Sequence, residues 1–151
     1  TSVCHLRPDS RGTIRISSTE PTARPVIAPN YLSAESDKLV AARAIRLTRR
    51  IMQAPAMARY TPQEFMPGTD YQSEDELIKA AGSIGTTIFH PVGTCRMGTD
   101  PRAVVSPELR VNGVTGLRVV DASIMPTIVS GNTNSPTLMI AEKAAAMILA
   151  G

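Results

Sequence analysis

The sequence predicts an α+β fold, and three observations support this prediction. Short runs rich in β-branched residues, at residues 13–17 and 117–121, lie between turn-forming residues, as strands do. Three stretches, two in the first half and one at the C-terminal end, have the apolar spacing or the capping residues of helices. The hydrophobic content of 42% over 151 residues is typical of a globular chain. We therefore expect a mixed or antiparallel sheet with flanking helices, followed by a C-terminal strand and helix.

The N-terminal part is expected to form a β-hairpin. Residues 8–12 contain Pro, Asp and Gly and predict a turn, and residues 13–17 predict a strand. Prolines at 21, 25 and 29 then favour an irregular crossing. A short second strand is possible within it, at residues 25–27.

The first helix is expected over residues 37–53, with Ser36 or Asp37 as its N-terminal cap. An apolar stripe is predicted on it, consisting of Val40, Ala44, Leu47 and Ile51. Four arginines lie mostly off this stripe, at positions 43, 46, 49 and 50. We interpret the arginines as a solvated face, with an acidic partner surface as the alternative.

A second helix is expected after a proline-rich loop at residues 55–70. Ser73 and Glu76 have the spacing of a capping box, in which each side chain binds the backbone N–H of the other. The helix should run to about Ala81, with Gly82 and Gly85 ending it.

His90 follows a strand-like run at residues 86–89 and precedes Pro91, which cannot continue a sheet ladder. Gly93 and Gly98 indicate turns beyond it. Histidine is the side chain whose ordinary pKa lies near neutrality, so this position suits an acid or base. On spacing alone, a structural histidine at the end of a strand is the favoured interpretation.

The C-terminal third predicts a strand at residues 117–121, a polar turn region and a last helix. The helix should begin near Pro136, with Asn134 or Ser135 as cap. Its buried face is expected to consist of Leu138, Ala141, Ala145 and Ile148.

Composition argues against several functions. The net charge is only +3 and aromatic residues make up 3%, which disfavours nucleic-acid binding. No apolar run approaches the ~18 residues of a membrane span. Cys4 and Cys95 are interpreted as reduced thiols of a cytoplasmic protein. With His5 and His90 they could supply four metal ligands, but their spacing is not that of a common zinc module, so we expect no metal.

Three motifs in order resemble the C-terminal signature of the glucose–methanol–choline (GMC) oxidoreductases, which are FAD-dependent. They are His-Pro-Val-Gly-Thr-Cys-Arg-Met-Gly at 90–98, Gly-Leu-Arg-Val-Val-Asp-Ala-Ser-Ile-Met-Pro at 116–126, and Asn-Thr-Asn-Ser-Pro-Thr at 132–137. Residues 6–16 also resemble the opening of the family's C-terminal region. The likeness is to the choline-dehydrogenase and alcohol-dehydrogenase type.

The resemblance implies a domain division. Residues 1–85 would be part of the substrate-binding domain, and residues 86–151 the catalytic segment and the tail of the FAD-binding domain. An FAD site also needs a glycine-rich turn for the pyrophosphate, and the chain contains no Gly-x-Gly. We therefore expect the C-terminal part of a longer enzyme, inactive in isolation, whose partners are the N-terminal FAD domain or a second copy of the chain.

The resemblance also implies a reaction: a primary alcohol is oxidised to an aldehyde, with a proton taken by His90 and a hydride transferred to flavin N5. Asn132 matches the second catalytic position, where it would hydrogen-bond the developing alkoxide. Without the resemblance, Asn132 would be an ordinary turn residue beside Gly131.

Five further residues are implied as contacts of the FAD. Asp121 and Ala122 would lie near its ribityl and phosphate region, while Asn134, Pro136 and Thr137, at a helix N-terminus, would face the N1/O2 side of its ring. The alternative function is a non-catalytic binding or assembly domain without flavin.

Overall fold

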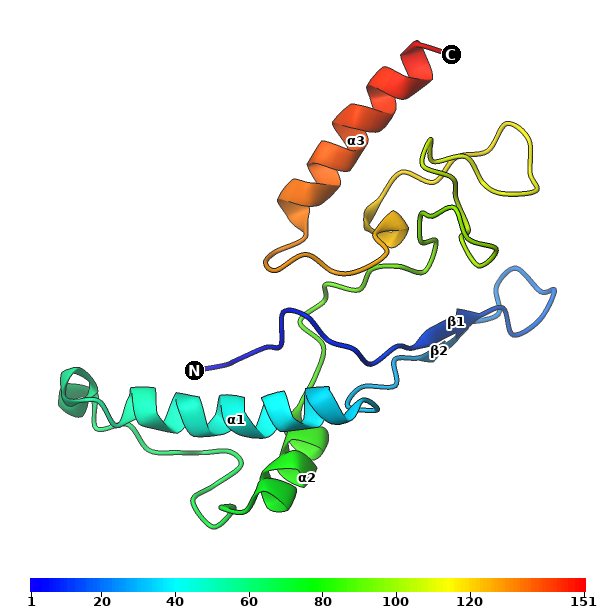
Figure 1. The fold of residues 1–151 in the computed structure, drawn as a ribbon. Coiled ribbons are helices and arrows are strands. Elements are labelled where there is room, and N and C mark those ends of the chain that lie inside the picture. The colour runs from blue at the N-terminus through cyan, green and yellow to red at the C-terminus, as the bar shows by residue number, and fades with distance from the viewer. The chain divides into compact units, whose positions relative to one another are not determined.

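The computed structural model describes residues 1–151, which form two compact units, Thr1–Thr86 and Thr87–Gly151. The first unit contains two strands, two α-helices and a 3₁₀ helix: β1 (Thr13–Arg15), β2 (Val26–Ala28), α1 (Glu35–Met52), η1 (Pro55–Tyr60) and α2 (Glu74–Ile84) (Figure 1). The second unit contains η2 (Ala122–Ile124) and α3 (Asn134–Leu149). No helix has the length and apolar character that a membrane span requires. The assignment of residues 1–85 and 86–151 to a substrate-binding and an FAD-binding domain stays a prediction.

The predicted α+β class is confirmed, although the sheet is small. β1 and β2 pair antiparallel, with Thr13 opposite Ala28 and Arg15 opposite Val26. Gly12 precedes β1 where the two backbones approach closely, because a Cβ at this position would lie 2.4 Å from the carbonyl oxygen of Ala28. Only a residue without a side chain allows this approach.

α1 begins at Glu35 after Ala34, so the predicted capping by Ser36 or Asp37 is wrong. The carboxylate of Asp37 instead accepts the backbone N–H groups of Asp9 and Ser10, at 2.9 and 2.8 Å. Asp37 is only 3% exposed. Burial raises the pKa of its carboxyl, but the hydrogen bonds from Ser10 and Asp9 outweigh this effect and leave the pKa below its ordinary value. Asp37 therefore holds the N-terminal segment against the start of α1.

α1 and α2 pack against each other, and their buried residues are Ala42 on α1 and Leu77 and Ala80 on α2. The predicted stripe on α1 is only partly correct, since Leu47 and Ile51 near the end of the helix are exposed. The capping box of α2 is confirmed, with Ser73 and Glu76 bonded reciprocally. α2 continues through Gly82 to Ile84, and Gly85 alone ends it.

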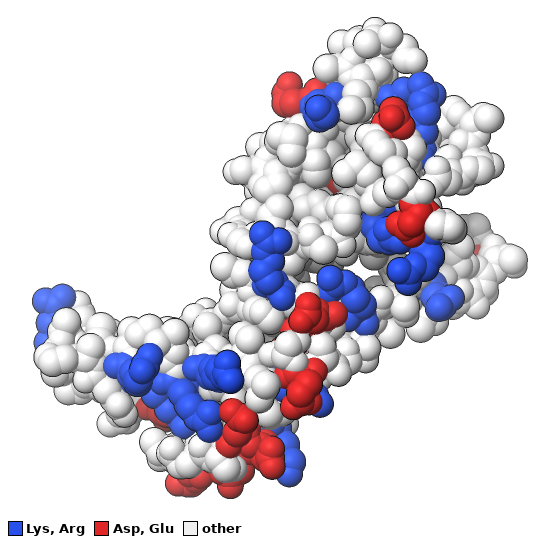
Figure 2. Space-filling model, in the orientation of Figure 1, with Lys and Arg blue, Asp and Glu red and all other residues white.

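Arg43 and Arg50 on α1 are exposed, as predicted for a solvated face, but Arg49 is an exception. Its guanidinium donates to both carboxylate oxygens of Glu64, at 2.9 and 2.8 Å, and to the carbonyls of Gly68 and Tyr71 at 3.0 and 2.8 Å. Its side chain is 15% exposed. Arg46 pairs with Glu74 at 3.3 Å. Acidic and basic side chains lie close together on parts of the face that Figure 2 shows. Arg49 thus fastens the loop after η1 to α1.

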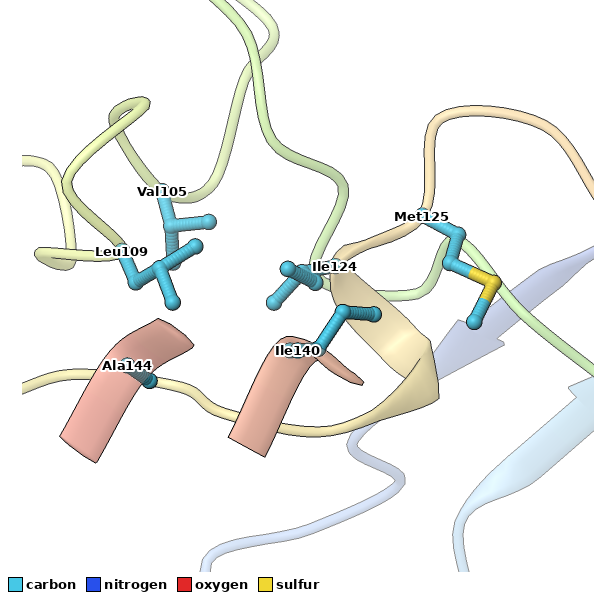
Figure 3. Packing of buried hydrophobic residues seen from close by; sticks show 6 residues of the cluster. All are labelled: Val105, Leu109, Ile124, Met125, Ile140 and Ala144. Carbon is cyan, nitrogen blue, oxygen red and sulfur yellow. The ribbon is translucent and has the colours of Figure 1, made fainter. Parts of the chain in front are cut away.

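The second unit has a small aliphatic core formed by Val105, Leu109, Ile124, Met125, Ile140 and Ala144 (Figure 3). The strand predicted at residues 117–121 is wrong: only one bridge forms, between Arg110 and Arg118, with Val111 N–H bonded to the Leu117 carbonyl at 2.9 Å. The pairing stays this short because the chain turns on both sides of it. Ser106 N–H bonds the Arg110 carbonyl at one side, and Gly113 has a positive φ at the other.

α3 begins at Asn134 after Thr133, so neither Asn134 nor Ser135 is the cap, and that prediction is wrong. Its buried residues are Ile140 and Ala144. The predicted buried face is also wrong: Leu138 and Ile148 are 59% and 53% exposed. α3 is apolar on more than one face, so the positions of its apolar residues did not indicate which face packs on the core.

Candidate active site

His90 lies on a turn, and the strand predicted at residues 86–89 is absent. The Thr87 hydroxyl oxygen accepts the N–H of Phe89 at 3.0 Å, and Phe89 has a left-handed φ of 63°. Such a local side-chain bond competes with sheet pairing. The chain therefore turns just before His90, whose side chain is half-buried.

The imidazole of His90 is held through Nδ1, which lies 2.5 Å from the carbonyl oxygen of Ile88. A carbonyl can only accept a hydrogen bond, so Nδ1 must carry the proton. In the neutral ring, Nε2 then keeps its lone pair and can accept a proton. This tautomer is the one that a general base acting through Nε2 requires.

The loop after His90 is bound to η2 through the backbone. Cys95 N–H bonds the Ser123 carbonyl at 3.0 Å, and Met97 N–H bonds the Ile124 carbonyl at 2.8 Å. Gly93 has a φ of 85°, and a Cβ there would lie 3.1 Å from the Met125 carbonyl oxygen. The motifs at 90–98 and 116–126, distant in the sequence, are thus joined in space.

Arg96, near the end of this loop, forms an ion pair with Asp100. Its guanidinium donates to both carboxylate oxygens of Asp100, at 2.9 and 2.6 Å. The hydrogen bonds from Arg96 and from the Arg102 N–H lower the pKa of the Asp100 carboxyl to about 2. The pair orders the turn that contains Gly98.

Asn132 lies on the segment between η2 and α3, and it is exposed. Val129, three residues earlier, packs on the aliphatic core, as does Val92, two residues after His90. The structure therefore anchors both predicted catalytic segments on one core. It shows no hydrogen bond between the side chains of His90 and Asn132.

The predicted cofactor contacts gather around η2 and the start of α3. Asp121 is exposed, and one of its carboxylate oxygens accepts the Ser123 N–H at 2.7 Å, which caps η2. Ala122 is half-buried on the same turn. One oxygen of the Asp121 carboxylate thus caps η2, and the side chain that carries the second oxygen is exposed.

The N-terminus of α3 supplies donors for a negative group. The N–H groups of Asn134 and Ser135 precede the first intrahelical hydrogen bond, which runs from Thr137 N–H to the Thr133 carbonyl at 3.0 Å. Pro136 has no N–H, and the Thr137 hydroxyl donates to the Thr133 carbonyl at 2.7 Å. Two donors and the helix dipole therefore favour a negatively charged group at this end of α3.

Thr87 is the site residue that sequence reasoning missed. Its β-branched side chain was interpreted as typical of a strand, whereas its hydroxyl forms the turn before His90. The signal for this alternative is a threonine two residues before the bonded N–H, as in a Ser/Thr turn. Elsewhere, the two cysteines are free thiols, and no three acidic, histidine or cysteine side chains come together as metal ligands.

Comparisons with known proteins identify the family. A family model described as GMC oxidoreductase matches residues 8–141. An alcohol dehydrogenase (acceptor) of Pseudomonas putida is 50% identical over 147 residues, which cover 97% of this chain and 27% of that protein. An oxygen-dependent choline dehydrogenase of Klebsiella pneumoniae is 50% identical over 145 residues, covering 94% of this chain and 26% of that protein.

Solved structures agree with this result. Pyridoxine 4-oxidase from Mesorbium loti has a TM-score of 0.91 at 38% identity, over 97% of this chain and 28% of its own. An FAD-dependent oxidoreductase from Chaetomium thermophilum has a TM-score of 0.87 at 34% identity, over 95% of this chain and 25% of its own. The chain spans about a quarter of the length of these relatives. It belongs to the GMC oxidoreductase family, and it matches the C-terminal portion of the family's members.

Proposed function

We propose that this chain forms the C-terminal part of the active site of an FAD-dependent enzyme that oxidises a primary alcohol to an aldehyde. The observation that carries the proposal is the geometry of His90, whose Nδ1 bonds a carbonyl and whose Nε2 remains a proton acceptor. Membership of the GMC family, together with relatives named as alcohol and choline dehydrogenases, supports this class of reaction.

Oxidation of an alcohol removes a proton from the oxygen and a hydride from the carbon. His90 Nε2 takes the hydroxyl proton, and the resulting imidazolium is stabilised by the Ile88 carbonyl at Nδ1. FAD, when bound, supplies the hydride acceptor. The proton transfer by itself is typically worth about 10²–10⁴-fold in rate.

Asn132 has the complementary role of holding the substrate oxygen. Its amide N–H₂ donates to the developing alkoxide, and its exposed position leaves this group available. An amide has no basic nitrogen, so His90 is the only base of the pair. Alanine at this position removes the donor, an effect worth about 10²–10³-fold in comparable sites.

The turn around η2 and the start of α3 would hold one side of the cofactor. Asn134 and Pro136 lie in the first turn of α3, and the Thr137 hydroxyl oxygen can still accept a bond, so this end would contact the flavin ring. Asp121 and the backbone of Ala122 would contact sugar hydroxyls, since a carboxylate repels phosphate. The remaining FAD contacts, and part of the substrate pocket, would come from an N-terminal FAD-binding part of the full-length enzyme.

The experiment compares the two histidines of the chain in the full-length protein. We expect His90→Gln to lower alcohol oxidation by about 10²–10⁴-fold while the flavin absorbance remains, because only the base is lost. His5→Gln is the matched control, since His5 lies in the first unit, 3.3 Å from Asp37, and is expected to leave oxidation unchanged. Unimpaired turnover by the His90 variant would contradict the proposal.

A further inference from the structure

We infer that Thr87 is a positioning residue for His90: its hydroxyl fixes the peptide whose carbonyl sets the histidine tautomer. The inference rests on the proposed role of His90 as the base. The observation behind it is that two hydrogen bonds meet on a single peptide unit, the one between Ile88 and Phe89. Thr87 and His90 flank this unit on the chain.

The peptide between Ile88 and Phe89 is trans, since the only cis bond of the chain lies between Met66 and Pro67. In a planar trans peptide the N–H and the carbonyl point in opposite directions. The N–H is bound by the Thr87 hydroxyl oxygen at 3.0 Å, and the carbonyl accepts the proton of His90 Nδ1. One rigid plane therefore links the hydroxyl on one side to the imidazole on the other, and a rotation of the plane breaks both bonds.

The turn needs such a bond because its backbone is unfavourable. Phe89 has a φ of 63°, which is rare for a bulky residue, and its side chain is 83% exposed. Packing of the ring therefore does little to compensate for the backbone conformation. The Thr87 hydroxyl is the side-chain group that bonds the N–H of this peptide, so its removal should allow the plane to rotate.

Rotation of the peptide would change which ring nitrogen of His90 carries the proton. Without the Ile88 carbonyl, Nδ1 loses its acceptor, and the ring reverts to the Nε2–H form that free histidine side chains prefer. That form cannot accept the proton of a substrate hydroxyl at Nε2. A hydroxyl that never touches the substrate would in this way determine how much of the enzyme contains an active base.

The direct test is the tautomer of His90 in the 151-residue chain labelled with ¹⁵N-histidine. The chain has only two histidines, and His90→Gln assigns their signals. We expect the Nδ1–H form in the unmodified chain and in Thr87→Ser, which keeps the hydroxyl. Thr87→Val, of nearly the same shape without the hydroxyl, should shift His90 to the Nε2–H form and leave His5 unchanged.

The full-length enzyme provides the second readout. Thr87→Val is expected to lower kcat about fivefold with KM unchanged, equivalent to about 1 kcal/mol, and Thr87→Ser to restore it. A wild-type tautomer and kcat in Thr87→Val, or an equal loss in Thr87→Ser, would overturn the inference. Thr87→Ala replaces the valine variant if that one does not fold.

The two proposals can fail separately. Full activity of His90→Gln would remove the role of His90 as base, whereas the tautomer measurement would still decide whether Thr87 acts on the ring. If His90→Gln loses activity but removal of the Thr87 hydroxyl changes neither the tautomer nor kcat, the role of His90 as base stands. Only the positioning role of Thr87 is then rejected.

Discussion

The two units of the chain are stabilised in different ways. In the first unit, regular helices pack against each other, and charged side chains such as Arg49 and Asp37 fasten the irregular segments to α1. In the second unit, residues 87–121 contain no helix and only isolated bridges, and their backbone groups bond one another across turns. A short aliphatic core supports that irregular chain.

The candidate active site lies in the unit whose irregular segments are held mainly by backbone hydrogen bonds. The loop after His90 is positioned by backbone bonds, such as Cys95 to Ser123 and Met97 to Ile124, and by a glycine that permits close approach. Backbone atoms have few soft torsions, so such bonds fix geometry more tightly than flexible side chains do. The first unit uses flexible side chains in regions that bear no predicted catalytic residue.

The largest expected effect comes from deleting core atoms in each unit. Leu77 is fully buried between α1 and α2, so Leu77→Ala should lower the free energy of unfolding by about 2–5 kcal/mol. Val105 is fully buried in the core of the second unit, so Val105→Ala should lower the free energy of unfolding by about 2 kcal/mol. Amide hydrogen exchange would check this: the first change should accelerate exchange in α1 and α2, and the second in the 96–119 region.

Leu149→Ala is the control for both substitutions, because Leu149 is exposed and its loss should change stability by less than about 0.5 kcal/mol. Uniform acceleration over all 151 residues from either core substitution would show that the two units unfold as one cooperative unit, and would contradict this prediction.

Sequence reasoning succeeded where the signal was contained in a few neighbouring residues. The capping box of α2 is such a signal, because Ser73 and Glu76 bind each other's backbone whatever surrounds them. The family motifs at 90–98 and 116–126 also correctly indicated that the chain belongs to the GMC family.

It failed where an interaction depends on a partner distant in the sequence. Residues 86–89 and 117–121 have strand composition, but a strand also needs a neighbouring strand. The Thr87 hydroxyl turns the chain just before His90, and turns on both sides limit the pairing of residues 117–121 to a single bridge. Asp37 looked like a helix cap because the N-terminal segment that occupies its carboxylate lies 27 residues earlier. The bonds from Arg49 to Glu64, Gly68 and Tyr71 were not predicted either, because these partners lie 15 to 22 residues later in the sequence.

The next effect concerns the half-buried ion pair of the first unit. Arg49→Lys keeps the charge but loses the two-pronged contact with Glu64, and we expect a loss of about 1–2 kcal/mol. The hydrogen bond from Arg49 lowers the pKa of the Glu64 carboxyl. Its contribution to stability is therefore present above pH 4.5, the ordinary value, and is lost as the pH falls through the lower folded pKa.

Chemical unfolding between pH 3 and 7 measures this effect, with Arg50→Lys as the matched control on the exposed side of α1. The acid-induced loss of stability should be smaller in Arg49→Lys than in the unmodified chain. Equal pH dependence in both would mean that the fork of Arg49 is not what depresses the Glu64 pKa.

The smallest effect concerns the corresponding pair of the second unit, Arg96 and Asp100. The partners are only four positions apart in the sequence, and both side chains are more exposed than those of Arg49 and Glu64. Arg96→Gln should therefore change the unfolding midpoint at neutral pH very little, since solvent screens the pair and the backbone bonds of the loop remain.

The pKa of Asp100 is the sensitive readout for this pair. It is lowered to about 2, chiefly by the hydrogen bonds from Arg96, so the stabilisation is complete above pH 3.8 and disappears as the pH falls through about 2. An NMR titration of the Asp100 carboxyl should show its midpoint rising towards 3.8 in Arg96→Gln. Arg102→Gln is the control: it keeps the backbone N–H that bonds Asp100, so the midpoint should not change. A large loss of stability in Arg96→Gln would instead show that a side chain, and not the backbone, holds the loop beside His90.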